Sequence, residues 1–182
     1  RMAASYNLVK PDGSFTGDTK TLQTSMGNAD VFIVDVFKDK GSSGRSVAFT
    51  FMTSGIFAEH PMNPTDSNSG GWKSSGMRAW LNGEVLQSFP DEMRSGVMAV
   101  SKLSNNAGKT TSPASVTETQ DSVWLFSWVE CLGPIAWNAR SNQSYIDTVD
   151  NKEGSQYAWF KQQGVAGEQG HALLDRSVAG SS

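Results

Sequence analysis

A glycine pair followed by one helical face most constrains what this chain can fold into. Gly70 and Gly71 let the backbone bend sharply because neither carries a Cβ atom, and Ser74 or Ser75 then offers a hydroxyl that can cap a helix. The apolar side chains that follow recur at the spacing of one helical face: Met77, Trp80, Leu81 and Val85. An Asn-Gly pair at 82–83 tolerates the left-handed backbone that ends helices, so the stretch predicts a short helix over 75–83.

Around this helix the sequence predicts antiparallel strands. Residues 31–37 are apolar and β-branched, and residues 47–52 alternate as an antiparallel partner would. The most hydrophobic run, 123–129, predicts a central buried strand. A second helix is predicted to begin near Pro90, because proline followed by two acidic residues suits a first helical turn, and its apolar face would run on to residue 100.

Polar segments separate these elements. Residues 1–30 predict an N-terminal arm or short edge strands, and residues 105–119 and 138–154 predict long loops. Residues 157–160 predict either a short strand or one helical turn. Strands, two short helices and then further strands indicate an α+β fold, and we expect a single domain over 31–182.

Composition narrows the classes of partner. The chain of 182 residues is 37% hydrophobic and 18% charged, a mix that suits an extracellular or virion protein rich in loops. Its net charge of −3, without a basic run, argues against nucleic acid, since phosphate binding needs clustered Lys and Arg. The sequence has no apolar run long enough to enter a membrane, and its single cysteine, Cys131, excludes an internal disulfide framework.

Four blocks of the sequence together resemble one family. The blocks are His60-Pro61-Met62-Asn63; Gly70-Gly71-Trp72-Lys73 with Ser75, Met77-Arg78 and Trp80-Leu81-Asn82; Val100 and Lys102 with Asp121, Val123-Trp124-Leu125, Ser127 and Glu130; and Glu153-Gly154 with Gln156-Tyr157 and Phe160. In order and spacing they resemble the bacterial DUF6273 family, over roughly residues 31–162.

The resemblance implies a fold of the C-type-lectin-like superfamily. That fold has a small antiparallel sheet, two short helices and long loops on one side. Members of the family tend to be secreted, surface-anchored or phage-associated proteins, and the resemblance implies no catalytic activity. We therefore expect loops held on a rigid scaffold, which is where recognition usually resides.

The candidate ligand-binding surface is the polar loop over 138–153, with one tryptophan at its edge. Tryptophan stacks on sugar rings and is enriched at protein interfaces. Most of the six tryptophans, Trp80 and Trp124 among them, are expected in the core, and Trp137 is the best surface candidate. The predicted ligand-binding residues are Trp137, Asn138, Arg140, Tyr145, Asp147 and Asp150.

Calcium is an alternative that the same loop raises. Asp147, Asp150, Asn151 and Glu153 could supply the oxygens that Ca²⁺ takes. Their spacing matches no EF-hand, and Trp137-Asn138-Ala139 lacks the acid of the calcium-dependent sugar-binding signature. A solvated loop is therefore the prediction, with no metal site and no cofactor.

Catalytic chemistry has few candidates. His60 and His171 are the two histidines, and either could act as a general base in a hydrolase, but no nucleophile motif of the Gly-x-Ser-x-Gly type accompanies them. Cys131 follows an apolar run and is expected to be a buried, unreactive thiol. Arg78 and Glu130 are predicted to form a structural ion pair between the helix and the 123–129 strand.

Three functions follow, in order of preference. The first is a non-enzymatic extracellular binding or adhesion module that recognises a glycan or a protein ligand. The second is a structural or receptor-binding subunit of a phage particle or surface fibre, whose arm packs on a neighbouring copy in a homo-oligomer. The third is a hydrolase. The expected location is extracellular, at a cell surface or on a virion.

Overall fold

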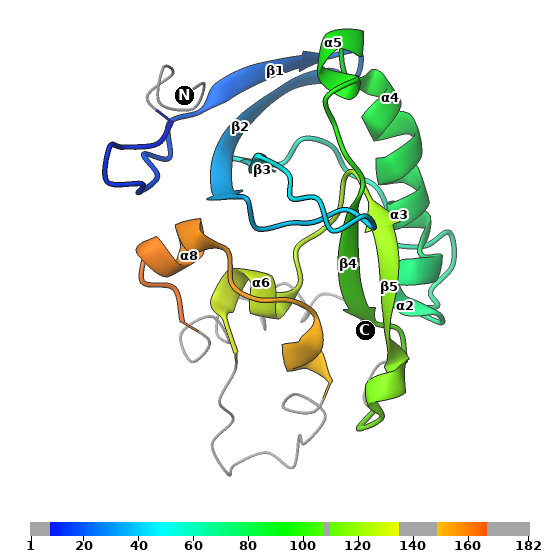
Figure 1. Ribbon diagram of the computed structural model, residues 1–182. Coiled ribbons are helices and arrows are strands. Elements are labelled where there is room, and N and C mark those ends of the chain that lie inside the picture. The colour runs from blue at the N-terminus through cyan, green and yellow to red at the C-terminus, as the bar shows by residue number, and fades with distance from the viewer. Residues whose placement is uncertain (1–7, 108–109, 135–148, 167–182) are drawn as a thin grey trace.

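The computed structural model describes residues 8–107, 110–134 and 149–166 (Figure 1). In that part of the chain two antiparallel sheets form, one of three strands in the order β1-β2-β3 and one of two strands, β4 and β5. The strands are β1 Lys20–Thr24, β2 Gly27–Val36, β3 Phe49–Thr53, β4 Val100–Asn105 and β5 Val116–Asp121. Two sheets joined by short helices agree with the α+β class predicted from the sequence.

The predicted strand pair is confirmed as β2 and β3. They pair antiparallel, with Val31 opposite Thr53, and the register shifts between Ile33 and Asp35. Strand β2 begins earlier than predicted because its first half pairs with β1, the edge strand within residues 1–30. Val34 on β2 is fully buried, since α8 (Ala158–Gln162) and the residues before it cover this face of the sheet.

The glycine-rich stretch opens a longer helix than predicted. A first turn, α2 (Gly71–Ser74), is followed by α3 (Gly76–Trp80), a π-helical turn η1 (Leu81–Val85) and α4 (Leu86–Ser88). The cap is confirmed, since the Ser75 Oγ accepts a hydrogen bond from the Arg78 N–H at 3.0 Å. The predicted end at 82–83 is wrong: Asn82 keeps a helical backbone and uses its side chain to bond residues 122 and 123.

A short helix and a strand follow. Helix α5 (Asp91–Arg94) begins directly after Pro90, as predicted. The predicted apolar face running to residue 100 is wrong, because Val100 opens β4. The loop predicted over 105–119 is also partly wrong, since residues 116–119 lie in β5. The side chains that this ribbon buries are largely polar, among them Lys102, Ser104, Thr119 and Asp121, so no apolar alternation marked the two strands.

The hydrophobic run at 123–129 is not the predicted central strand. Residues 124–127 belong to no helix or strand, and α6 (Trp128–Leu132) begins within the run. Ser127 and Glu130 form a capping box that fixes this helix start. Phe126 packs on Tyr157, with ring centroids 4.6 Å apart, so the run still contributes to the core.

Short helical elements complete the described chain. They are the 3₁₀ turns η2 (Pro113–Ser115) and η3 (Asp150–Lys152), and α8, which confirms the helical alternative predicted for residues 157–160. Figure 1 shows α6 and α8 on one side of the fold, with α2–α4 flanking the β4–β5 ribbon. Within the described ranges, no helix is long and apolar enough to cross a membrane.

Candidate functional site

The predicted ligand-binding loop is largely outside the described residues. Trp137, Asn138, Arg140, Tyr145 and Asp147 fall in the range 135–148, and the second histidine, His171, follows the last described residue. Asp150 is the first residue of η3. Five of the six predicted binding residues thus lie outside the described residues, and their grouping into one site stays a prediction.

A solvent-open hollow of about 300 Å³ lies beside Trp72. Residues from the loop after β3, from α2, from the end of β4 and from the segment after η3 line it: Met62, Asn63, Asn68, Gly71, Trp72, Ser104, Asn105 and Glu153. Met62 and Trp72 supply apolar surface, whereas three amides, a hydroxyl and one carboxylate supply hydrogen-bonding groups. Such a lining suits a ligand that has an apolar face and polar edges.

The floor of the hollow depends on a glycine. Gly71 has a φ of +52°, and a Cβ added there would lie 2.7 Å from the Asn106 Cα. Only glycine therefore lets the first turn of α2 approach the end of β4 this closely. The Asn106 side chain then joins the two elements, because its Oδ1 accepts from the Lys73 N–H at 3.0 Å and its Nδ2 donates to the Ser104 carbonyl at 2.8 Å.

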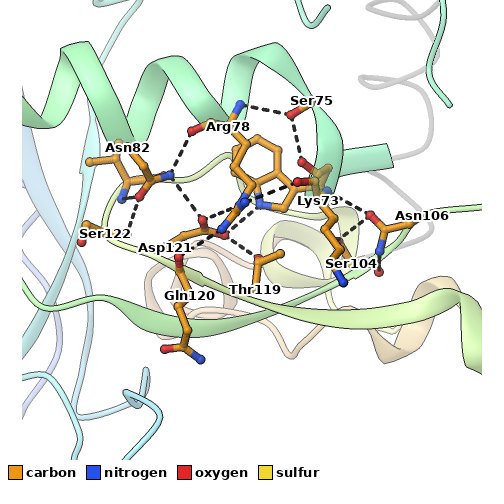
Figure 2. A network of polar contacts seen from close by, with 12 residues as sticks. Lys73, Ser75, Arg78, Asn82, Ser104, Asn106, Thr119, Gln120, Asp121 and Ser122 are labelled. Atoms are coloured by element: carbon orange, nitrogen blue, oxygen red, sulfur yellow. Dashed lines mark hydrogen bonds and ion pairs between the residues drawn. The ribbon is translucent and has the colours of Figure 1, made fainter. Parts of the chain in front are cut away.

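Trp72 is held at its polar edge. Its Nε1 donates to the Asp121 Oδ2 at 2.9 Å, and Asp121 is completely buried. Three further donors bond the same carboxylate: Arg78 Nε at 2.7 Å, Thr119 Oγ1 at 2.6 Å and Asn82 Nδ2 at 3.3 Å. Figure 2 shows these side chains converging from the helix and from β5 onto Asp121. The indole beside the hollow is therefore fixed before any ligand arrives.

The loop wall of the hollow is also tied to the helix. The Asn63 Oδ1 accepts from the Gly76 N–H at 3.0 Å, and the Met62 carbonyl accepts from the Met77 N–H at 2.9 Å. Nearby, the His60 ring stacks on Trp80 with centroids 4.5 Å apart, and its Nδ1 lies 2.7 Å from the Pro61 carbonyl. His60 is thus a packing partner of the helix, and it does not line the hollow.

The opposite wall carries the one carboxylate among the described lining residues. The Glu153 Oε1 accepts from the Asn105 N–H at 2.5 Å, and its backbone carbonyl accepts from the Ser127 Oγ at 3.2 Å. These bonds join the segment after η3 to the end of β4 and to the start of α6. Glu153 therefore places a carboxylate among the groups that line the hollow.

The ion pair predicted between Arg78 and Glu130 is wrong. Arg78 pairs with Asp121, and Glu130 pairs with Lys102 instead. The prediction failed because it took residues 123–129 for a strand that would bring Glu130 beside the helix. The capping box at Ser127 turns Glu130 inward toward β4.

A second buried polar cluster surrounds Lys102. Its Nζ contacts the Glu130 Oε1 and lies 3.2 Å from the Asp39 Oδ1 and 2.9 Å from the Tyr157 OH. The Thr50 Oγ1 donates to the Asp39 Oδ2 at 2.6 Å. All five side chains are buried, and none lines the hollow.

Cys131 is expected to react slowly in the folded protein. Burial, together with the nearby Glu130 charge, raises the pKa of the thiol to about 12. Iodoacetamide attacks the thiolate, so at pH 8 we expect alkylation to be at least ~100-fold slower in buffer than in urea. Mass spectrometry of timed samples measures both rates, and equal rates would contradict a half-buried, protonated thiol.

Residues 49–177 match DUF6273, a domain of unknown function, and the chain belongs to this family. No curated protein and no solved structure matches the chain. Within the described ranges, no group of three or more His, Cys, Asp or Glu side chains could hold a metal ion.

The sequence does not predict the hollow, although several of its residues lie in the blocks that carry the resemblance. Met62, Asn63, Gly71, Trp72 and Glu153 belong to the blocks that resemble the family, and three separate blocks meet here. Nothing in the spacing indicated that meeting. It depends on β4 and β5, which the sequence did not predict as strands.

Proposed function

We propose that this protein is a non-enzymatic binding module outside the cytoplasm, which takes part of a glycan or protein ligand into the hollow beside Trp72. The observation that carries the proposal is the fixed indole among amides and a carboxylate. Because Asp121 already holds the indole, little side-chain entropy is lost when a ligand packs on it. A volume of about 300 Å³ is at the small end of ligand pockets and suits one sugar ring or one large side chain.

The ionisable groups in the interior and in the lining of the hollow support a binding function over a catalytic one. The carboxylate of Asp121 is occupied by four donors, and Lys102 and Glu130 lie inside the fold and bond one another. Glu153 is the one ionisable group among the described lining residues. A carboxylate that has no second ionisable group in the same described lining is suited to accept a hydrogen bond from a ligand.

Filling the hollow should weaken binding. Asn68 is exposed on its wall, so Asn68→Phe is expected to place a ring in the cavity and weaken binding by at least ~10-fold, which corresponds to about 1.4 kcal/mol. A glycan array first identifies the glycans that the unaltered chain binds, and binding of the variants is then measured with those glycans. Thr65→Phe is the matched control, because Thr65 is exposed on the same loop and does not line the hollow.

If Asn68→Phe and Thr65→Phe both bound as well as the unaltered chain, the hollow would not be the binding site. The 138–153 loop would then be tested. Failure of the unaltered chain to bind any glycan would remove the glycan form of the proposal. In that case the protein form would be tested by the same pair of variants against proteins of the cell surface.

A structural subunit is the second candidate. Large apolar side chains are exposed on the described surface, with Phe37 at 68% and Ile56 at 88% of full exposure. Phe37 also holds a left-handed backbone, with a φ of +54°, which is costly for an aromatic residue. Contact with a neighbouring subunit would cover these side chains. Light scattering distinguishes the candidates, since a stable assembly favours the subunit and a monomer favours the binding module.

A further inference from the structure

The buried cluster around Lys102 brings an amine and two carboxylates together inside the fold. Relative exposures are 6% for Lys102, 7% for Asp39 and 3% for Glu130. The three come from distant segments: Asp39 follows β2, Lys102 is on β4, and Glu130 is on α6. Aromatic rings surround the amine, with the centroids of Trp124 and Tyr157 at 4.6 and 5.3 Å from Nζ.

Backbone hydrogen bonds hold the segments that carry Asp39 and Lys102 in place. The Lys40 carbonyl accepts from the Ser101 N–H at 2.8 Å, so the residues next to Asp39 and Lys102 in sequence are joined. The Asp39 carbonyl accepts from the Val47 N–H at 2.9 Å, which fixes the turn that carries this carboxylate. With the Lys102 Nζ 3.2 Å from the Asp39 Oδ1, the amine lies beside the carboxyl carbon to which that oxygen is bonded.

Burying these charges is costly, and a covalent bond would remove two of them. An ammonium and a carboxylate lose their hydration inside the fold, and their attraction only partly offsets that loss. Amide formation between them converts both charges into a neutral group and releases one water. Proximity and a buried, apolar surrounding are the conditions under which such a condensation is favoured over hydrolysis.

We propose that Lys102 and Asp39 become joined by an intramolecular amide bond, and that Glu130 carries the proton between them. Glu130 takes one proton from the Lys102 ammonium, which leaves a neutral amine. The Nζ lone pair attacks Cγ of Asp39, and a tetrahedral intermediate forms. Glu130 returns its proton to Oδ1, which leaves with a second proton from Nζ as water. One C–N bond forms, one C–O bond breaks, and no oxidant or other co-reactant is needed.

Hydrogen bonds distinguish the roles of the two carboxyl groups. The Asp39 oxygens accept from two hydroxyls, Thr50 at 2.6 Å and Tyr157 at 3.0 Å, which withdraw electron density from Cγ and stabilise a developing oxyanion. Burial raises the pKa of the Tyr157 hydroxyl, so it stays protonated and can donate. Glu130 instead uses Oε2 to accept from the Ser127 N–H in the capping box, and its Oε1 contacts Lys102 as a base would.

The test is the intact mass of the full chain in denaturant. We expect a mass lower by one water, about 18 Da, than the sequence requires. Glu130→Gln and Lys102→Arg should each have the full mass of their own sequences. Trypsin should release a branched peptide that joins residues 39–40 to residues 95–109, because the linked Lys102 is no longer cleaved.

Other outcomes overturn the proposal. An unaltered chain with its full sequence mass excludes the bond. A loss of water that persists in Lys102→Arg places the change elsewhere, for example at Asp12-Gly13, where a cyclic imide gives the same mass. A branched peptide joined through Glu130 would contradict the assigned roles. The measurement needs no ligand, so it is independent of the proposed binding function.

Discussion

Replacing Asp121 by asparagine is expected to lower the free energy of unfolding by about 3 kcal/mol, although the two side chains have nearly the same shape. Asp121 is completely buried, and its partners from Trp72, Arg78 and Asn82 are all N–H donors. An amide group turned either way would direct its own N–H groups at one of these donors. The Arg78 side chain, 29% exposed, would keep part of its hydration, which places the loss at the lower end of the range for buried pairs.

Urea denaturation of Asp121→Asn and of Asp91→Asn measures the difference. Asp91 also pairs with an arginine, Arg94, but its side chain is 90% exposed. Exposed pairs contribute at most about 1 kcal/mol, so the control is expected to unfold close to the unaltered chain. If both variants lost the same stability, the Asp121 cluster would not act as a buried junction between the helix and β5.

The same variant should also affect the hollow. In Asp121→Asn the one remaining acceptor oxygen cannot serve Trp72 and Arg78 together, so the indole would no longer be held in one orientation. We expect weaker ligand retention at temperatures where the variant is still folded. The matched exposed variant Asp91→Asn should retain binding, because Asp91 is not among the lining residues.

Local signals in the sequence predicted local structure well. The β-branched run before residue 37 became β2, the glycine pair with Ser75 gave the helix start, and Pro90 preceded α5. Each of these features depends on neighbouring residues alone. The chain's membership of its family was also indicated by blocks of sequence, which the match over residues 49–177 supports.

Elements that depend on distant polar contacts were not predicted. Strands β4 and β5 bury Lys102 and Asp121, charged residues that hydropathy assigns to the surface. Their burial is tolerated only because partners on other elements neutralise them. The predicted Arg78–Glu130 pair is wrong for a related reason. The sequence shows which residues carry charge, but it does not show which charges meet in the fold.

Many residues that carry the family resemblance are internal to the fold. Arg78, Asn82 and Asp121 form one buried junction, and Lys102, Glu130 and Tyr157 form the other. Because these polar residues join distant segments of the chain, a few of them are enough to define the scaffold. Ligand choice would then reside in lining residues such as Met62 and Asn68, which the scaffold holds in place.

The second large effect is expected for Lys102→Met, which should cost about 3–5 kcal/mol of unfolding free energy. Methionine matches much of the lysine stem and leaves little cavity, so the loss comes from the missing amine and not from packing. Asp39 and Glu130 would face one another without a cation between them, at positions more than nine-tenths buried. Lys40→Met is the control, since Lys40 is exposed and its replacement is expected to change stability by less than about 0.5 kcal/mol.

A double variant separates charge from packing. In Lys102→Met with Glu130→Gln one of the two uncompensated carboxylates is neutral, so the double variant should be more stable than Lys102→Met alone. The amide oxygen of the introduced glutamine can still accept from the Ser127 N–H, which preserves the start of α6. Urea denaturation of the unaltered chain, the single variant and the double variant provides the comparison.

The stabilities of these variants also test the proposed covalent bond between Lys102 and Asp39. A bond between residues 39 and 102 closes a long loop and would restrict the unfolded chain, as a disulfide does. Glu130→Gln should prevent the bond while keeping the lysine, so its lower stability would reflect the lost cross-link. If Lys102→Met were as stable as the unaltered chain, Lys102 would neither neutralise the two carboxylates nor join the sheet to the ribbon.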